Sequence, residues 1–220
     1  MPEVSRRSLL RGGAAIGLGT AIGAGIGIPA GAFDRRAVDQ PYIASCAEWG
    51  ARPPSSPVTV IRHRPVKIIV HHTALENSTD YSQQHAFAMS REIQDLHMDQ
   101  NGWLDSGQQF TNSRGGWITE GRHGSLDALL GGQTLIQGAQ CVGQNDVSIG
   151  IENEGNYVDA DPPDALYQSL IGLCAFICSQ YGIAPTEIYG HQDFNNTQCP
   201  GRLEGRLPDL RTQVAARLAG

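Results

Sequence analysis

Three side chains near the ends of apolar segments have the chemistry of a metal site. A histidine, His71 or His72, ends one apolar run, His191 follows another, and Cys199 lies in the loop after it. Two imidazoles and a thiolate with an open fourth position match a catalytic zinc ion, which polarises carbonyls and acidifies water. Because successive side chains of a strand point to opposite faces, only one of the adjacent histidines can share a site with His191. The spacing alone leaves that choice open.

Two carboxylates, Glu152 and Glu154, occur two residues apart in a further apolar segment. Residues at this spacing in a strand face the same side of a sheet, so both acids are expected on one face. Such a pair suits either a general base or a solvated salt-bridging surface. The remaining histidines lack a comparable context and are expected at the surface: His63, His85, His97 and His123.

The elements that must position these groups are indicated by apolar periodicity and by turn residues. Strands are predicted at 66–73, 107–113, 117–122, 135–141, 148–154 and 188–189, and helices at 44–49, 82–99, 163–181 and 207–218. Strands and helices intermix without regular alternation, which predicts a single α/β domain with a central mixed β-sheet flanked by helices on both faces. Residues 33–65, rich in Pro and Arg, are expected to form an N-terminal arm on a domain of residues 66–220.

The first 32 residues have the pattern of a twin-arginine signal peptide. Arg6-Arg7 precedes a stretch, residues 12–32, that has no charged residue and ends in Ala30-Gly31-Ala32. The uncharged stretch is long enough for a membrane anchor, but its many glycines and alanines favour cleavage. We therefore expect a secreted protein, extracellular or in the cell wall, with no stable membrane anchor after cleavage.

Charge and cysteine content limit the partners and the covalent framework. The net charge of −6 argues against nucleic acid as a partner. The five cysteines are an odd number for an exported protein, so one of them suits a metal ligand. If Cys199 is that ligand, Cys174 and Cys178 lie one helical turn apart and are expected to bridge to Cys46 and Cys141. Buried free thiols are the alternative.

Five motifs follow one another in a characteristic order. They are Trp49–Arg52, Ile68–Ala74, Asn145–Glu152, Gly190–Asp193 and Thr197–Gly201. Together they resemble the peptidoglycan recognition protein and N-acetylmuramoyl-L-alanine amidase family, over about residues 45–215. The resemblance implies the corresponding peptidoglycan recognition protein-like fold. It also implies a zinc-dependent enzyme that hydrolyses the amide bond between the lactyl group of N-acetylmuramic acid and L-alanine in peptidoglycan.

The resemblance also assigns roles to individual residues. His71, His191 and Cys199 correspond to the family's Zn²⁺ ligands, and His72 is left as a core residue or a neighbour of the site. Glu152 corresponds to a general base that takes a proton from the attacking water and passes it to the departing amine. Thr197 corresponds to a position near the scissile carbonyl. Members of the family that bind peptidoglycan without catalysis typically lack the cysteine.

One motif departs from the family. Many catalytic members have Asp-Ile-Gly-Tyr where this chain has Asp105-Ser106-Gly107-Gln108, so a tyrosine is replaced by Gln108. An amide can donate a hydrogen bond but supplies no phenol, which shifts the proton-transfer role to Glu152. Gln108, Arg122 and Trp117 are the predicted substrate-binding residues.

The sequence is compatible with three functions. The first is the zinc amidase acting on peptidoglycan or muramyl peptides, and the second is a non-catalytic peptidoglycan-binding recognition protein. The third is a zinc amidase of another secreted amide, because the site chemistry specifies the reaction and only the resemblance supplies the substrate. With no second binding module in the sequence, a monomer is expected.

Overall fold

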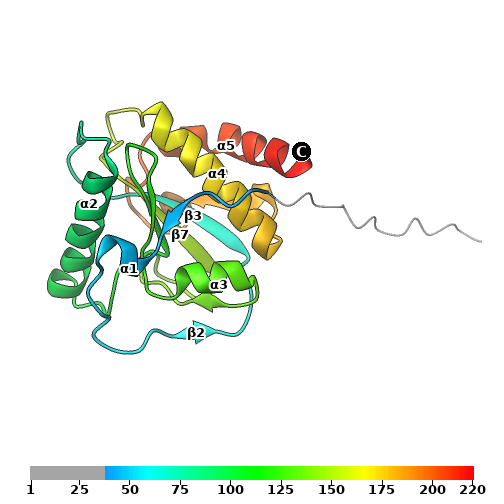
Figure 1. The fold of residues 1–220 in the computed structure, drawn as a ribbon. Coiled ribbons are helices and arrows are strands. Elements are labelled where there is room, and N and C mark those ends of the chain that lie inside the picture. Colours follow the sequence, from blue (N-terminus) through cyan, green and yellow to red (C-terminus); the bar gives the residue numbers. More distant parts are fainter. Residues whose placement is uncertain (1–37) are drawn as a thin grey trace, which may run out of the picture. The chain divides into compact units, whose positions relative to one another are not determined.

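The computed structural model describes residues 38–220, which form a single α/β domain (Figure 1). The predicted signal peptide of residues 1–32 lies outside the described residues. The six strands of the main sheet, in spatial order, are β1 (Ile43–Ala44), β5 (Ile118–Glu120), β4 (Phe110–Asn112), β7 (Ser148–Asn153), β3 (Lys67–His72) and β8 (Ile188–Gly190). A separate pair is formed by β2 (Val60–Ile61) and β6 (Leu135–Ile136).

The main sheet is mixed, as the sequence predicts. β3 pairs in parallel with both β7 and β8, and β4 pairs in parallel with β7 but antiparallel with β5. The segment before residue 66 is part of this architecture, because β1 pairs in parallel with β5. The carboxyl ends of β3, β7, β4 and β8 therefore meet at one edge of the sheet, where loops can bring reactive side chains together.

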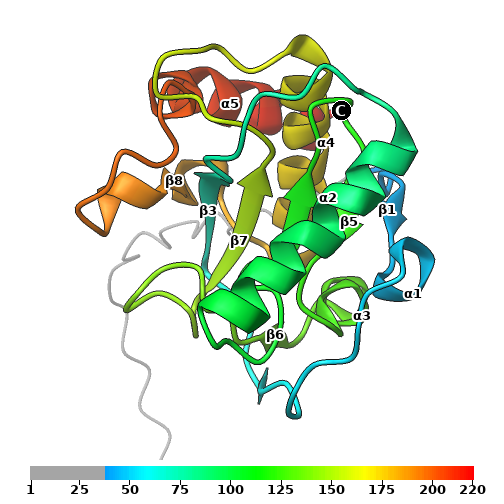
Figure 2. The ribbon, with the colours of Figure 1, turned by 90° about the vertical axis from the view of Figure 1, so that its left-hand side faces the viewer.

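The helices and helical turns are α1 (Cys46–Trp49), α2 (Gln83–Asp95), η1 (Leu96–Gln100), α3 (Ser125–Gly131), α4 (Asp164–Tyr181), η2 (Pro185–Glu187), η3 (His191–Asp193) and α5 (Leu203–Ala219). α2 lies on one face of the sheet, and α4 and α5 lie on the other (Figure 2). Within residues 38–220, no helix combines the length and apolar character that crossing a bilayer requires.

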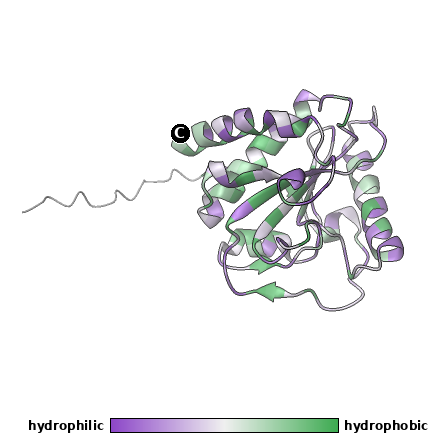
Figure 3. Ribbon diagram, turned by 180° about the vertical axis from the view of Figure 1, so that it is seen from behind, coloured by the Kyte–Doolittle hydropathy of each residue, from purple (hydrophilic) through white to green (hydrophobic). Residues whose placement is uncertain are grey.

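The central strands are buried on both faces, which explains their nearly continuous apolar sequence. Ile68, Val70, Ile149 and Ile151 are at most 2% exposed. Burial of each such side chain stabilises the fold by about 1.5–3 kcal/mol. Figure 3 shows the same pattern, with hydrophobic strands inside and helices that alternate between hydrophobic and hydrophilic residues. The apolar core therefore holds β3 and β7 in place, and the candidate histidine and glutamate lie near the ends of these strands.

Helix α5 begins earlier than predicted. The sequence predicts a start at Leu207, but the helix starts at Leu203 and contains Pro208. Leu203 and Leu207 are both buried against the core, at 1% and 2% exposure. Packing of these two leucines favours the earlier start. Helix α3 is not among the predicted elements, and strand β6 is shorter than its predicted segment.

The predicted disulfide bridges are not formed in the described residues. The thiol of Cys46 donates to the carbonyl of Gly121 at 3.4 Å, and the thiol of Cys141 donates to Asn195 Oδ1 at 3.2 Å. Cys174 is fully buried in α4, within the main core. Cys174 and Cys178 of α4 thus belong to the main core, whereas Cys46 belongs to a separate apolar cluster.

Candidate metal centre and catalytic groove

His71, His191 and Cys199 form a compact cluster at the carboxyl edge of the sheet. One potential ligand atom from each residue lies within 4.8 Å of the others. His71 is the penultimate residue of β3 and His191 follows β8, and these two histidines meet because the two strands are parallel neighbours. The structure thus brings together the three residues that the sequence predicts as metal ligands.

The spacing within the cluster fits a tetrahedral metal ion. His71 Nδ1 lies 3.7 Å from Cys199 Sγ. A tetrahedral zinc ion with bonds of about 2.05 Å to nitrogen and about 2.3 Å to sulfur would separate these ligand atoms by about 3.6 Å. The imidazole rings of His71 and His191 lie 4.5 Å apart between centroids.

The protonation preferences of the cluster also suit a cation. Burial lowers the pKa of His71 to about 3 and lowers the pKa of His191, so both imidazoles keep lone pairs for a metal at neutral pH. Burial raises the pKa of the Cys199 thiol to about 12, so without a metal it stays protonated. The backbone N–H of His72 points at Cys199 Sγ from 3.3 Å, and a bound cation would stabilise the thiolate further.

His72 faces away from the cluster. Its Nδ1 accepts a hydrogen bond from the backbone N–H of Tyr157 at 3.1 Å, and the side chain is 8% exposed. The strand alternation thus places His71 with the ligands, and His72 contacts Cys199 Sγ through its backbone, from the N–H at 3.3 Å and the carbonyl at 3.8 Å.

Glu152 lies one strand away from His71, opposite it in the parallel pairing of β3 and β7. Paired residues of neighbouring strands lie on the same face, and the strands are about 4.8 Å apart. The Glu152 side chain is 14% exposed. Burial raises the pKa of Glu152 to about 8. A carboxyl group with a pKa close to neutral pH can both accept and return a proton, which is the property of an acid–base catalyst.

His97 approaches Glu152 from the helical side and corrects the expectation that it lies at the surface. It is 6% exposed, and its Nδ1 accepts from the backbone N–H of Gly107 at 3.1 Å. Burial lowers the pKa of His97 to about 4, so its Nε2 carries the single proton of a neutral ring. That Nε2 lies 3.9 Å from Glu152 Oε1. The sequence did carry a signal for this burial, because His97 follows Met89 and Ile93 at the four-residue spacing of one buried helix face.

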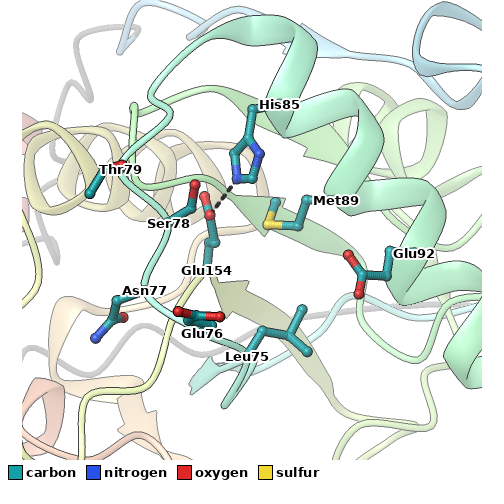
Figure 4. Close-up of a pocket in the computed structure, with 9 residues that line it drawn as sticks. All are labelled: Leu75, Glu76, Asn77, Ser78, Thr79, His85, Met89, Glu92 and Glu154. Atoms are coloured by element: carbon teal, nitrogen blue, oxygen red, sulfur yellow. Dashed lines mark hydrogen bonds and ion pairs between the residues drawn. The ribbon is translucent and has the colours of Figure 1, made fainter.

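A groove between α2 and the loop after β3 extends from these residues. A cavity of about 520 Å³ is lined by Leu75, Glu76, Asn77, Ser78, Thr79, His85, Met89, Glu92 and Glu154 (Figure 4). A smaller one of about 40 Å³ shares Leu75 and Glu92 with it and reaches Glu152 and His97. The two cavities are therefore neighbouring parts of one groove that ends beside the candidate base.

Glu154 forms the floor of the larger cavity. Its carboxylate accepts from the backbone N–H of Arg114 at 2.7 Å. It also lies 2.7 Å from His85 Nε2, a contact drawn in Figure 4. Glu152 and Glu154 thus point to the same side of the sheet, toward α2, as expected from their spacing. His85 is half-buried in this contact and is not the free surface residue that we predicted. Glu152 lies 3.9 Å from His97, a longer contact than the two made by Glu154, and is therefore the better placed of the two acids for proton transfer.

The predicted substrate-binding residues occupy different surroundings. The amide of Gln108 is buried and donates to Thr111 Oγ1 at 2.8 Å, and Thr111 pairs with Glu152 across β4 and β7. The guanidinium of Arg122 is buried and donates to the carbonyls of Ser106 and Gln137, which is a structural role.

The remaining two predicted residues lie on loops. Trp117 is half-buried, and its Nε1 donates to the carbonyl of Tyr81, next to the loop that lines the larger cavity. The hydroxyl of Thr197, the second predicted catalytic residue, accepts from the backbone N–H of Cys199 at 3.1 Å. Thr197 therefore supports the loop that presents the thiol to the cluster.

The raised pKa of Glu152 predicts a pH-dependent stability of the metal-free protein. The unfolded chain releases this proton near pH 4.5 and the folded protein near pH 8, so folding becomes less favourable as the pH rises through that window. The histidines with lowered pKa values make folding more favourable as the pH rises, but only below about pH 6.5. Between pH 6.5 and 8 we expect Glu152 to cost about 2 kcal/mol of unfolding free energy.

Denaturant unfolding of chelator-treated protein at pH 6.5 and pH 8 measures this cost. The Glu152→Gln variant, which has no titrating proton at this position, is expected to lose most of the difference. Equal pH dependence in the variant and the unmodified protein would contradict the assignment of the buried proton to Glu152.

The fold and the cluster define a single-domain α/β protein with a His-His-Cys metal-type site at the edge of a mixed sheet. The family model described as N-acetylmuramoyl-L-alanine amidase matches residues 62–202, more than half of the chain. The chain belongs to this family, which confirms the resemblance seen in the sequence motifs.

Relatives and solved structures agree with this assignment. The chain is 31% identical over 166 residues to peptidoglycan-recognition protein LB of Drosophila melanogaster, covering 75% of this chain and 65% of that protein. It is 31% identical over 172 residues to peptidoglycan-recognition protein SC2 of Drosophila simulans, covering 77% and 85%.

The wild-type structure of Drosophila peptidoglycan recognition protein LB matches with a TM-score of 0.65 and 29% identity, covering 76% of this chain and 92% of that one. A mutant of the same Drosophila protein, solved in complex with tracheal cytotoxin, matches with a TM-score of 0.62 and 29% identity, covering 72% and 88%.

Proposed function

We propose that this protein is a zinc-dependent N-acetylmuramoyl-L-alanine amidase that hydrolyses the bond between the lactyl group of muramic acid and L-alanine in peptidoglycan. The observation that carries the proposal is the cluster of His71, His191 and Cys199 with the largely buried carboxyl group of Glu152 one strand away. The family match supports the reaction class.

Each residue of the site would have a distinct role. His71, His191 and Cys199 would hold zinc, which when bound supplies a Lewis acid for the lactyl carbonyl and lowers the pKa of a water molecule. Glu152 would accept the proton of the attacking water and deliver it to the nitrogen of the departing L-alanine. His97 Nε2–H, 3.9 Å away, would favour the ionised carboxylate at the moment it forms.

The groove beside α2 would bind the stem peptide. Its larger cavity, of about 520 Å³, has room for several residues, and it leads toward Glu152 through the shared side chains of Leu75 and Glu92. The relative solved with tracheal cytotoxin, which is monomeric diaminopimelic acid-type peptidoglycan, supports a muramyl peptide as the ligand. Such a substrate lies outside the cytoplasm, which is consistent with the twin-arginine signal predicted for residues 1–32.

The replacement of the family tyrosine by Gln108 is the feature that favours the alternative function, peptidoglycan binding without catalysis. The Gln108 side chain donates to Thr111 and is 1% exposed, so it is a poor donor for a substrate. In the proposed amidase, Glu152 alone would therefore transfer the proton, and no phenol would be needed.

Incubation of the purified protein with defined muramyl peptides separates the two functions. Mass spectrometry is expected to show a free L-alanine amino terminus, with release abolished by a chelator and restored by added Zn²⁺. Cleavage that persists after complete removal of the metal would contradict zinc dependence. Muramyl peptide binding without any release would contradict the amidase and support the recognition function.

A further inference from the structure

Both histidines of the candidate metal centre contact a carboxamide oxygen through Nε2. His71 Nε2 lies 2.6 Å from Gln140 Oε1, and His191 Nε2 lies 3.1 Å from Asn195 Oδ1. We propose that Gln140 and Asn195 are positioning residues that hold both imidazoles as Nε2–H tautomers and thereby direct both Nδ1 lone pairs to the metal. This inference rests on the proposed zinc site.

The orientation of the Gln140 amide follows from its other contacts. Gln140 Nε2 lies 3.0 Å from Ser148 Oγ, and that hydroxyl lies 2.7 Å from the backbone carbonyl of Gln144. A carbonyl can only accept, so the Ser148 hydroxyl donates to it and must accept from Gln140. The amide nitrogen of Gln140 therefore faces Ser148, and its oxygen faces His71. An amide oxygen can only accept, so His71 Nε2 must carry the proton.

The Asn195 amide is oriented in the same manner. Its Nδ2 donates to the carbonyl of Phe194 at 2.9 Å and points to the carbonyl of Val142 at 3.5 Å, and both carbonyls can only accept. Asn195 Oδ1 therefore faces His191, and it also accepts from the thiol of Cys141 at 3.2 Å. Two donors on this oxygen fix the amide against rotation.

A neutral imidazole has one N–H and one lone pair, so protonation at Nε2 leaves Nδ1 as the only ligand atom. For His71 this is the atom that lies 3.7 Å from Cys199 Sγ, at the separation expected for two ligands of one tetrahedral ion. Gln140 thus contacts His71 directly, on the side of the ring away from the metal site. Its neighbour Cys141 contacts Asn195, which in turn contacts Nε2 of His191.

Gly150 of β7 leaves space for the Gln140 amide because glycine has no side chain. A Cβ atom added to Gly150 of β7 would lie 2.5 Å from Gln140 Cγ and 2.7 Å from its Cδ. Any side chain at residue 150 would therefore displace the Gln140 amide from His71. Gln140 itself is 8% exposed, which shields its hydrogen bond to His71 from competition by water.

Zinc affinity, measured by competition with a chromophoric chelator, tests the proposal without relying on activity. Gln140→Leu removes the acceptor and is expected to raise the zinc dissociation constant by about 10–100-fold, the range typical for loss of such outer contacts. Gln140→Glu keeps an acceptor oxygen in place and is expected to restore affinity to near that of the unmodified protein. Asn195→Leu removes the acceptor from His191 and is expected to weaken zinc binding in the same range.

Gln144→Leu is the matched control, because Gln144 lies in the same loop but its side chain contacts Lys67 and neither imidazole. It is expected to bind zinc with unchanged affinity. The visible absorption of bound Co²⁺, which reports coordination geometry, is expected to change in the leucine variants at 140 and 195 and to be retained in Gln140→Glu.

The outcomes distinguish this inference from the proposed function. Tight zinc binding by the unmodified protein, with equal affinity in the leucine variants at 140 and 195, would overturn the inference and leave the amidase proposal standing. Absence of zinc binding by the unmodified protein would overturn both. Thermal unfolding of the metal-free variants identifies a folding defect, and if leucine at 140 prevents folding, Asn195→Leu decides the question.

Discussion

Cys199→Ser is expected to lose both zinc and amidase activity. The thiolate is the only anionic ligand of the cluster, and a serine hydroxyl at neutral pH is a neutral, harder donor that zinc prefers less. The loss of zinc affinity should exceed about 100-fold, which is the upper end of the range for substituting residues that contact a metal ligand without binding the metal themselves. Metal content after dialysis and release of L-alanine peptides measure the two effects separately.

Cys141→Ser is the appropriate control for this substitution. Cys141 lies close to the cluster but outside it, and a serine hydroxyl can still donate to Asn195 as the thiol does. This variant is expected to keep stoichiometric zinc and most of its activity. A Cys199→Ser protein that retains stoichiometric zinc would refute the assignment of Cys199 as a ligand.

Glu152→Gln is expected to keep zinc and lose most of kcat, by about 10²–10⁴-fold, the usual contribution of a general base. The amide has nearly the same shape as the carboxyl group and lies outside the ligand cluster, so the metal site should be undisturbed. The variant cannot accept the proton of the attacking water, and substrate binding is expected to change little. Metal analysis measures the zinc content, and steady-state kinetics measures kcat and KM separately.

Glu154→Gln provides the comparison, since Glu154 belongs to the same face but contacts His85 and the backbone of Arg114. Because it lines the larger cavity, its substitution is expected to alter KM more than kcat. Unchanged turnover in Glu152→Gln would transfer the base role to Glu154 or to the metal alone. A large loss of kcat only in Glu154→Gln would identify Glu154 as the base.

The sequence was sufficient for the parts of the fold that depend on long apolar patterns. Strands β3 and β7 and helix α4 lie within one or two residues of their predicted bounds, because their burial on the inside of the domain requires continuous apolar residues. Short elements such as α3 and the start of α5 depend on packing partners far away in the chain, so local propensity misplaced or missed them.

The residue types alone indicated a metal site that includes His191 and Cys199, and they placed Glu152 and Glu154 on one face of a strand. The sequence motifs were also enough to indicate the family, and this resemblance selected His71 over His72 and Glu152 over Glu154. The tertiary structure supplied the physical reason for the choice between the two histidines. The parallel pairing of β3 with β8 brings His71 and His191 together, and strand alternation then turns His72 to the other side.

The partners of these groups were likewise decided by the fold alone. η1 buries His97 beside Glu152, and the loop at Gln140 reaches His71 although 69 residues separate them in sequence. No local pattern encodes such contacts, because they depend on which distant segments the sheet brings side by side. Residue types thus set which chemistry is available to this protein, and burial and strand pairing decide which atoms carry it out.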